Sequence, residues 1–136
     1  MNPSYAFTVE IDQPMAAATD TLRAALGTEK MGIVSEVDVQ ATLRNKLGID
    51  SHPQKLLGIC SPGIAHALMT AEPDIGALLP CSAAVTETVA GRTRIALQDP
   101  LVIAAQSQNA QVHEACAQAS AALRRVVEGL RTGAAT

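Results

Sequence analysis

The sequence predicts a two-layer α+β domain, in which a five-stranded, mostly antiparallel sheet carries the long first and last helices on one face. Five short segments have the alternation or composition of strands. Segments with apolar residues at helical spacing separate most of them, and the longest of these helical segments are the first and the last. A chain of 136 residues fits one domain, with an ordered core from about residue 4 to 130.

The chain opens with a strand and then a helix. Apolar and polar residues alternate from Tyr5 to Ile11, which is typical of a strand with one buried face. Asp12 is placed to cap a helix that has Pro14 in its first turn. Apolar residues then recur at helical spacing, and Gly27 is a natural end for this helix.

A second strand leads into a short helix. The alternation over residues 31–39 predicts the strand, and Asp38 is placed to cap a helix from about 39 to 47. Gly48 follows as a stop signal. The apolar stripe of this short helix consists of Val39, Leu43 and Leu47.

The third strand and its following helix meet at a cysteine. The apolar run "KLLGIC" over residues 55–60 predicts a strand that ends at Cys60. Ser61 suits a helix cap and Pro62 suits the first helical position, so a helix is expected over residues 62–71. The sequence "AEPD" then breaks it.

The remaining chain predicts a hairpin and a long helix. Residues 78–97 are rich in Thr, Val and Ile on both sides of Gly91, which indicates an antiparallel hairpin. Residues 101–107 predict a short turn of helix. The clearest helix comes last, and its apolar stripe consists of Val112, Ala115, Cys116, Ala119, Leu123, Val126, Val127 and Leu130.

Composition and charge argue against several classes of partner. The formal net charge is −3 and no dense Lys/Arg cluster is present, so we expect no nucleic-acid binding. The near absence of aromatic residues also removes the platforms on which single-stranded bases stack. No signal peptide and no long apolar run appear, so we expect a cytoplasmic protein without a membrane partner, whose three cysteines are reduced.

Three stretches in one order resemble a known family. They are "GIVSEVDVQATLRNKLGI", "LLGICSPGIAHALM" and "AEPDIGALLPCSAAV". Each is short, but together they are similar to the bacterial and archaeal family catalogued as domain of unknown function 302, from about residue 5 to 130. The resemblance implies a TBP-like fold of the β-α-β4-α kind and a homodimer. It implies no settled activity and no DNA binding.

Two departures from the family pattern affect the expected pocket. Ser61 stands where relatives often have Asn after the cysteine, and the polar sequence "SHPQKLLG" replaces a stretch in which an aromatic residue is common. These differences weaken any transfer of pocket detail from the family. They leave the predicted fold unchanged.

Cys60 and Cys81 are the first candidates for chemistry. Cys60 precedes a helix start, where free N–H groups and the helix dipole favour a thiolate. It is equally well read as a small apolar residue at a strand end. In the resembled fold the strands that carry Cys60 and Cys81 share a sheet, so the two thiols are candidates for a metal site or a reversible disulfide. Cys116 is expected in the core.

Glu36 and Asp38 are candidate ligand-binding carboxylates. As residues i and i+2 of one strand, they project to the same side about 6–7 Å apart. Such a pair can share a proton, a divalent ion or a cationic ligand. The competing interpretations are a surface ion pair for Glu36 and a helix cap for Asp38.

The histidines and the remaining acids give weaker signals. His66 lies one turn into the helix after Cys60, where it would orient or deprotonate that thiol or simply face solvent. His52 is expected in a loop and His113 on the polar side of the last helix. Glu72 and Asp74 flank a proline and are expected in a turn.

Two functional hypotheses follow from these residues. The first is a dimeric module that binds a small ligand or a metal near Cys60, with Glu36, Asp38, Cys60 and Cys81 lining the pocket. For a metal, the candidate ligands are Cys60, Cys81 and Glu36. The alternative is a thiol-dependent enzyme or redox switch, with Cys60 and His66 as the catalytic candidates and Cys81 as the resolving thiol. A third interpretation is a partner-binding subunit without chemistry, in which Cys60→Ser and Glu36→Gln would leave every function intact. The sequence specifies no cofactor and no reaction.

Overall fold

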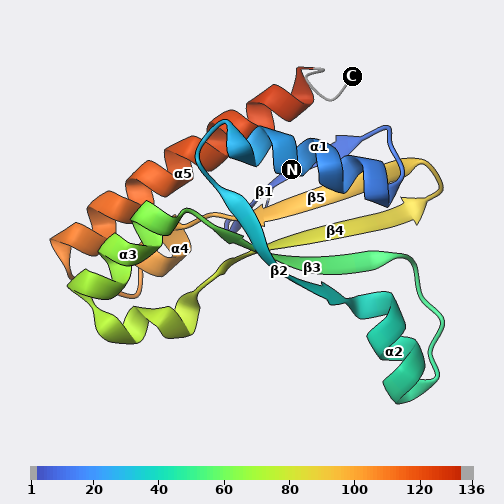
Figure 1. The fold of residues 1–136 in the computed structure, drawn as a ribbon, viewed down its shortest axis with the longest axis horizontal. Coiled ribbons are helices and arrows are strands. Elements are labelled where there is room, and N and C mark those ends of the chain that lie inside the picture. The colour runs from blue at the N-terminus through green and yellow to red at the C-terminus, as the bar shows by residue number, and fades with distance from the viewer. Residues whose placement is uncertain (1–2, 133–136) are drawn as a thin grey trace.

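The computed structural model describes residues 3–132 of the chain. Its described strands form one antiparallel sheet with the spatial order β1-β5-β4-β3-β2 (Figure 1). This arrangement confirms the predicted five-stranded α+β fold. The elements are β1 (Ala6–Ile11), α1 (Met15–Gly27), β2 (Gly32–Asp38), α2 (Val39–Leu47), β3 (Gln54–Cys60), α3 (Pro62–Ala71), the 3-10 helix η1 (Pro73–Leu78), β4 (Cys81–Val89), β5 (Arg92–Gln98), α4 (Leu101–Ala104) and α5 (Ala110–Arg131).

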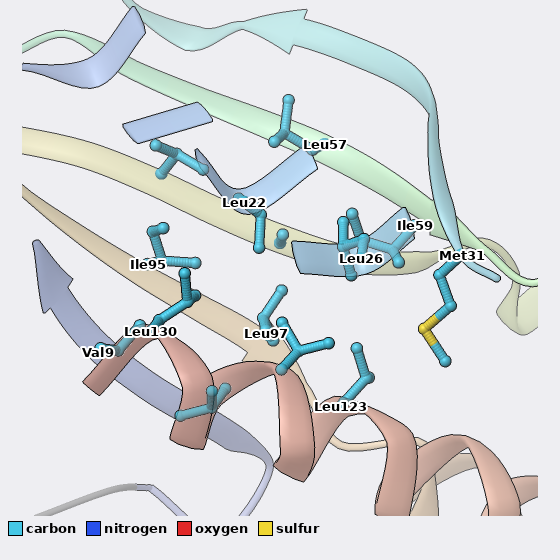
Figure 2. Packing of buried hydrophobic residues seen from close by; sticks show 14 of the residues in the cluster. Val9, Leu22, Leu26, Met31, Leu57, Ile59, Ile95, Leu97, Leu123 and Leu130 are labelled. Atoms are coloured by element: carbon cyan, nitrogen blue, oxygen red, sulfur yellow. The ribbon is translucent and has the colours of Figure 1, made fainter. Parts of the chain in front are cut away.

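The long helices α1 and α5 lie side by side on one face of the sheet, as predicted (Figure 1). Figure 2 shows Leu22 of α1 and Leu123 of α5 lying toward Ile95 and Leu97 of β5. These side chains belong to the larger of two buried apolar clusters. Within residues 3–132, no helix has both the length and the apolar character needed to cross a bilayer.

The start of α1 differs from the sequence prediction. Asp12 does not cap this helix, because its carboxylate pairs with the guanidinium of Arg92. The side chain of Glu87, from β4, takes the capping role instead. The backbone N–H of Met15 donates to Oε1 of Glu87 at 2.8 Å, and the N–H of Gly91 donates to Oε2 at 2.9 Å. One long-range carboxylate therefore joins the start of α1 to the β4–β5 turn.

The short helix α2 begins and ends as predicted. The N–H of Ala41 donates to Oδ1 of Asp38 at 2.9 Å, so Asp38 is its cap. Gly48 ends it in the left-handed conformation, with φ of 65°. None of the nine residues of α2 is buried, although the helix carries an apolar stripe.

Two further local predictions need correction. Ser61 precedes α3, but its side chain makes no capping hydrogen bond; Pro62 nevertheless occupies the first turn. The "AEPD" sequence does break α3, but the chain continues into η1 before β4 begins at Cys81. The short helix expected over residues 101–107 is limited to α4.

The sheet face opposite α1 and α5 carries a row of apolar residues that runs from two larger side chains to two alanines. Leu57, Ala83 and Leu97 are buried on the helix side, so their immediate neighbours in the strands point to the other side. The strand registers place Val37 beside Leu56, Leu56 beside Ala84, and Ala84 beside Ala96. We call these four residues the open-face row.

Candidate ligand-binding cavity at Cys60

A cavity of about 320 Å³ lies where the end of β3 meets α3 and α5. The start of β2, the η1 segment, the start of β4 and the α4 region complete its wall. The lining residues are Met31, Val34, Ile59, Cys60, Ser61, Ile64, Ala65, Leu68, Met69, Gly76, Leu79, Pro80, Cys81, Pro100, Ile103, Cys116, Ala119 and Leu123.

The cavity lies at the boundary between the two apolar clusters. Ile59 and Leu123 belong to the larger cluster under the sheet. Leu68, Ile103 and Cys116 belong to the smaller cluster formed mainly by α3, η1, α4 and α5. All five line the cavity, so the space between the two clusters is incompletely filled by this chain's own side chains.

The structure brings two of the predicted residues, Cys60 and Cys81, to this cavity. Both are half-buried free thiols. Cys81 lies opposite Ile59 in the β3–β4 register, next to the position of Cys60 at the end of β3. Both residues line the cavity, although they come from separate strands.

Burial sets the protonation of two of the thiols. Burial first, and then the negative charge of Cys116, Cys60 and Asp99 nearby, raise the pKa of Cys81 to about 11. Burial also raises the pKa of the Cys116 thiol, against a hydrogen bond with the backbone of Ala104 that lowers it. At neutral pH both groups are uncharged, so they behave as apolar wall and as poor nucleophiles.

Three sulfur-bearing residues of the wall were missed as site residues. Cys116 is buried in α5, as predicted, but it also borders the cavity. Met31 and Met69 line it as well. Helical periodicity shows which side of α5 is buried, but it does not show which buried residue borders an empty space. No sequence signal would have found them.

Glu36 and Asp38 do not line the cavity, which corrects the expectation of a shared pocket. Glu36 lies opposite Leu57 in the β2–β3 register, three positions before Cys60 on β3, or about 10 Å along the strand. Its carboxylate pairs with the ammonium of Lys55. Asp38 caps α2. Both carboxylates therefore follow the competing interpretations, an ion pair and a helix cap.

His66 also lies away from the cavity wall. It is exposed on α3 and lines a different groove, together with Gln111, Glu114 and Gln118 of α5. The predicted partnership between His66 and Cys60 does not appear in this arrangement. His52 lies in the loop before β3, and Nε2 of His113 is 2.6 Å from the backbone oxygen of Ser107.

The described residues offer limited support for a metal centre. Across residues 3–132, no three His, Cys, Asp or Glu side chains are grouped so that they could hold a metal ion. Cys60 and Cys81 line the same cavity, but Glu36 is engaged with Lys55 elsewhere on the sheet. The donor set expected from the sequence is therefore not assembled around one point.

Glu72 fastens the segment that forms one side of the cavity. It lies between α3 and η1, and the hydroxyl of Ser107 donates to its Oε1 at 2.7 Å. Nδ2 of Asn109 donates to the backbone oxygen of Ala71 at 3.3 Å. These two bonds tie the α3–η1 junction to the loop before α5. Glu72 thus does more than shape the turn that the sequence indicated.

The fold and the cavity define a small α+β domain with an antiparallel sheet, two long helices on one face and an apolar site at one end. Within that class, the chain belongs to the family described as "Domain of unknown function DUF302", whose family model matches residues 7–130. This match confirms the resemblance found in the sequence.

A solved structure shares the fold. It is the crystal structure of an uncharacterized conserved protein, DUF302, from Bacillus stearothermophilus. The TM-score is 0.81 at 24% sequence identity, covering 93% of this chain and 98% of the other. A search of curated proteins found no match.

Proposed function

We propose that this protein is a binding module that holds a small, neutral, apolar ligand in the cavity at Cys60. The observation that carries the proposal is a cavity of about 320 Å³ bounded almost entirely by apolar and sulfur-bearing side chains. Small-molecule sites typically enclose about 300–1,000 Å³ and have mainly apolar walls. An apolar cavity of about 150 Å³ accepts benzene, so this one has room for a two-ring molecule.

The wall chemistry favours a neutral ligand. The lining residues include no Asp, Glu, Lys, Arg or His, and Ser61 is the lining residue with a hydroxyl group. The buried thiols of Cys81 and Cys116 are protonated at neutral pH. A charged ligand would lose its water here without gaining a partner of opposite charge. The polarizable sulfurs of Met31 and Met69 make favourable contacts with aromatic rings. We therefore favour a neutral aromatic compound.

A soft metal ion is a second form of the same binding function, with Cys60 and Cys81 as ligands. Binding would require Cys81 to lose its proton, and burial opposes that loss by raising its pKa to about 11. Metal analysis of protein purified without a chelator tests this form. Stoichiometric metal that disappears in a Cys60→Ser variant would support it, and metal-free protein would dismiss it.

A redox switch is the alternative function, because Cys60 and Cys81 line the same cavity. Hydrogen peroxide would oxidise the Cys60 thiolate to sulfenate with release of water. The Cys81 thiol would then attack the sulfenic acid, form the S–S bond and release a second water. Mass spectrometry after peroxide treatment checks this route. It predicts a Cys60–Cys81 disulfide in the wild type and a trapped sulfenic acid in Cys81→Ser; unchanged thiols would rule it out.

We also propose that the protein acts as a homodimer, as the family resemblance implies. Large apolar side chains remain exposed around α2, which is what an uncovered subunit surface would present. Nothing in the cavity proposal requires the dimer, so the two proposals are tested separately.

A neutral fluorescent probe tests the ligand-binding proposal. Prodan, a neutral dye built on the two rings of naphthalene, shifts its emission to shorter wavelength in apolar surroundings, and we expect saturable binding to the wild type. Ala65 lines the cavity on α3, whereas Ala67 lies on the same helix in the other groove. Ala65→Phe fills the cavity and is expected to abolish binding, while Ala67→Phe is the matched control. Equal binding by both variants, or none by the wild type, would refute the proposal.

A further inference from the structure

The helix α2 packs within its own chain along one side only, where Val39 and Leu43 are half-buried and the helix contacts β3. It has nine residues and none is buried. In Figure 1 it extends beyond the end of β2, away from α1 and α5. A helix this short is marginal in water by itself, and helices of folded proteins gain most of their stability from packing an apolar face. The exposed side of α2 would therefore be stabilised by a further surface to pack against.

Large apolar side chains are exposed on α2, in the loop that follows it, and on the neighbouring strands β2 and β3. Val37 is 51% exposed, Leu47 65%, Ile49 47% and Leu56 40%. We call these four residues the arm surface. Together they present on the order of 300 Å² of apolar area, which is comparable with the largest apolar patch of a typical monomer and marks an interaction site.

The same chain offers a hollow on the open face of the sheet, at the small side chains of Ala84 and Ala96. The open-face row continues from Val37 and Leu56 to Ala84 and Ala96, on the side of the sheet that α1 and α5 do not cover. Small residues allow another element to approach the sheet closely. The arm surface thus provides large apolar side chains, and Ala84 and Ala96 provide a shallow surface that accepts them.

We propose that a second copy of this chain covers both surfaces, with α2 of each subunit packed on the open-face row of the other. The inference rests on the homodimer proposed above and names its interface. A two-fold axis brings the same patch of each subunit into contact, so one interface covers the arm surface and the open-face row of both subunits. No second type of partner is needed.

The available area agrees with a small, stable dimer. The two arm surfaces together contribute roughly 600 Å² of apolar area. Stable interfaces bury about 1,200–2,000 Å² in total, of which somewhat more than half is apolar. Ala84 and Ala96 of each subunit, together with the polar residues of α2, supply the remaining interface area. The interface therefore falls at the lower end of the standard size range.

Substitutions on each side of the contact test the inference. Leu47→Lys alters the arm and leaves a residue that suits the end of a helix. Ala84→Lys alters the opposing row. Val89 is 63% exposed at the end of β4, so Val89→Lys is a control of equal exposure outside the interface. Sedimentation equilibrium measures the dimer constant, circular dichroism checks folding, and hydrogen exchange measures the protection of α2.

We expect a wild-type dimer that Leu47→Lys and Ala84→Lys each weaken at least about tenfold, with loss of α2 protection, while Val89→Lys stays dimeric. A dimer that neither variant weakens would overturn the interface and leave the homodimer standing. A monomeric wild type at its highest attainable concentration would overturn both. Probe binding in the cavity is measured separately for the wild type and for each variant.

Discussion

Cys81 lies opposite Ile59 in the β3–β4 register, one position from Cys60 along β3, and both cysteines line the same cavity. The antiparallel pairing of two strands, and no local sequence motif, creates this relationship. Burial then keeps Cys81 protonated by raising its pKa. The uncharged Cys81 thiol therefore contributes to an apolar wall at neutral pH.

Alkylation of Cys81 should depend steeply on pH. Because its pKa is raised to about 11, iodoacetamide should modify it very slowly at neutral pH and progressively faster toward pH 11. Peptide mass spectrometry of the native protein gives the rate, and the same peptide in urea gives the ordinary rate. Fast modification of native Cys81 at neutral pH would show that this thiol is a reactive group.

The same ionisation should affect stability in alkaline solution. The folded pKa lies above the ordinary value of 9.0, so the folded chain holds this proton more tightly than the unfolded chain. The stabilising contribution is complete below pH 9.0 and is lost as the pH rises through about 11. Cys81→Ala should flatten this part of the pH–stability curve in urea unfolding; an unchanged slope would contradict the assignment.

Local sequence patterns predicted the elements well. The alternation from Tyr5 to Ile11 identified β1, and Asp38 followed by Gly48 marked the ends of α2. These signals succeed because neighbouring residues determine strand alternation and helix caps. The family resemblance extended the prediction to the arrangement of the sheet.

Long-range partners could not be predicted in the same way. Glu87 replaces Asp12 as the cap of α1 because the β4–β5 hairpin brings it to the helix start. Glu36 looked like a ligand because a strand gave it no routine role, but Lys55 on the neighbouring strand pairs with it. Cys116 borders a cavity whose shape depends on how α3 and α5 pack. Each feature depends on tertiary packing that short-range periodicity does not encode.

Glu87→Gln should weaken the start of α1. The N–H groups of Gly91 and Met15 lower the pKa of this carboxyl by binding its charged form. Its stabilising effect is therefore present above the ordinary pKa of 4.5 and is lost as the pH falls through the lower folded value. We expect a Tm lower by a few degrees at neutral pH, and a smaller difference in acid. Glu114→Gln, at an exposed site on α5, is the control, and a Tm equal to wild type would contradict the role of Glu87.

Glu72→Ala should loosen one wall of the cavity. It removes the acceptor for the Ser107 hydroxyl, one of the two hydrogen bonds that tie the α3–η1 junction to the loop before α5. We expect a loss of about 1 kcal/mol in unfolding free energy. Hydrogen exchange should rise in α3 and η1, and the probe should enter and leave faster. Asp74→Asn, at an exposed position on η1, serves as the control, and identical exchange in both variants would disprove the fastening role.

Gly58→Ala should destabilise the sheet through a specific clash. A Cβ at this position would lie 2.7 Å from Cγ of Pro80 and closer still to the hydroxyl of Ser35. We expect a cost of about 1–3 kcal/mol in urea unfolding. Adding Ser35→Gly should recover part of this loss, because one of the two obstructing groups is then removed. A double variant no more stable than Gly58→Ala would contradict the proposed contact.

Diffraction from crystals under xenon pressure tests the apolar cavity most directly, because xenon enters dry apolar cavities and does not replace well-bound water. We expect xenon to bind in the wild-type cavity among Met31, Cys81 and Leu123, and to be excluded from crystals of Ala65→Phe. Ordered, hydrogen-bonded water filling the cavity, with no xenon, would contradict the proposed site for a neutral apolar ligand.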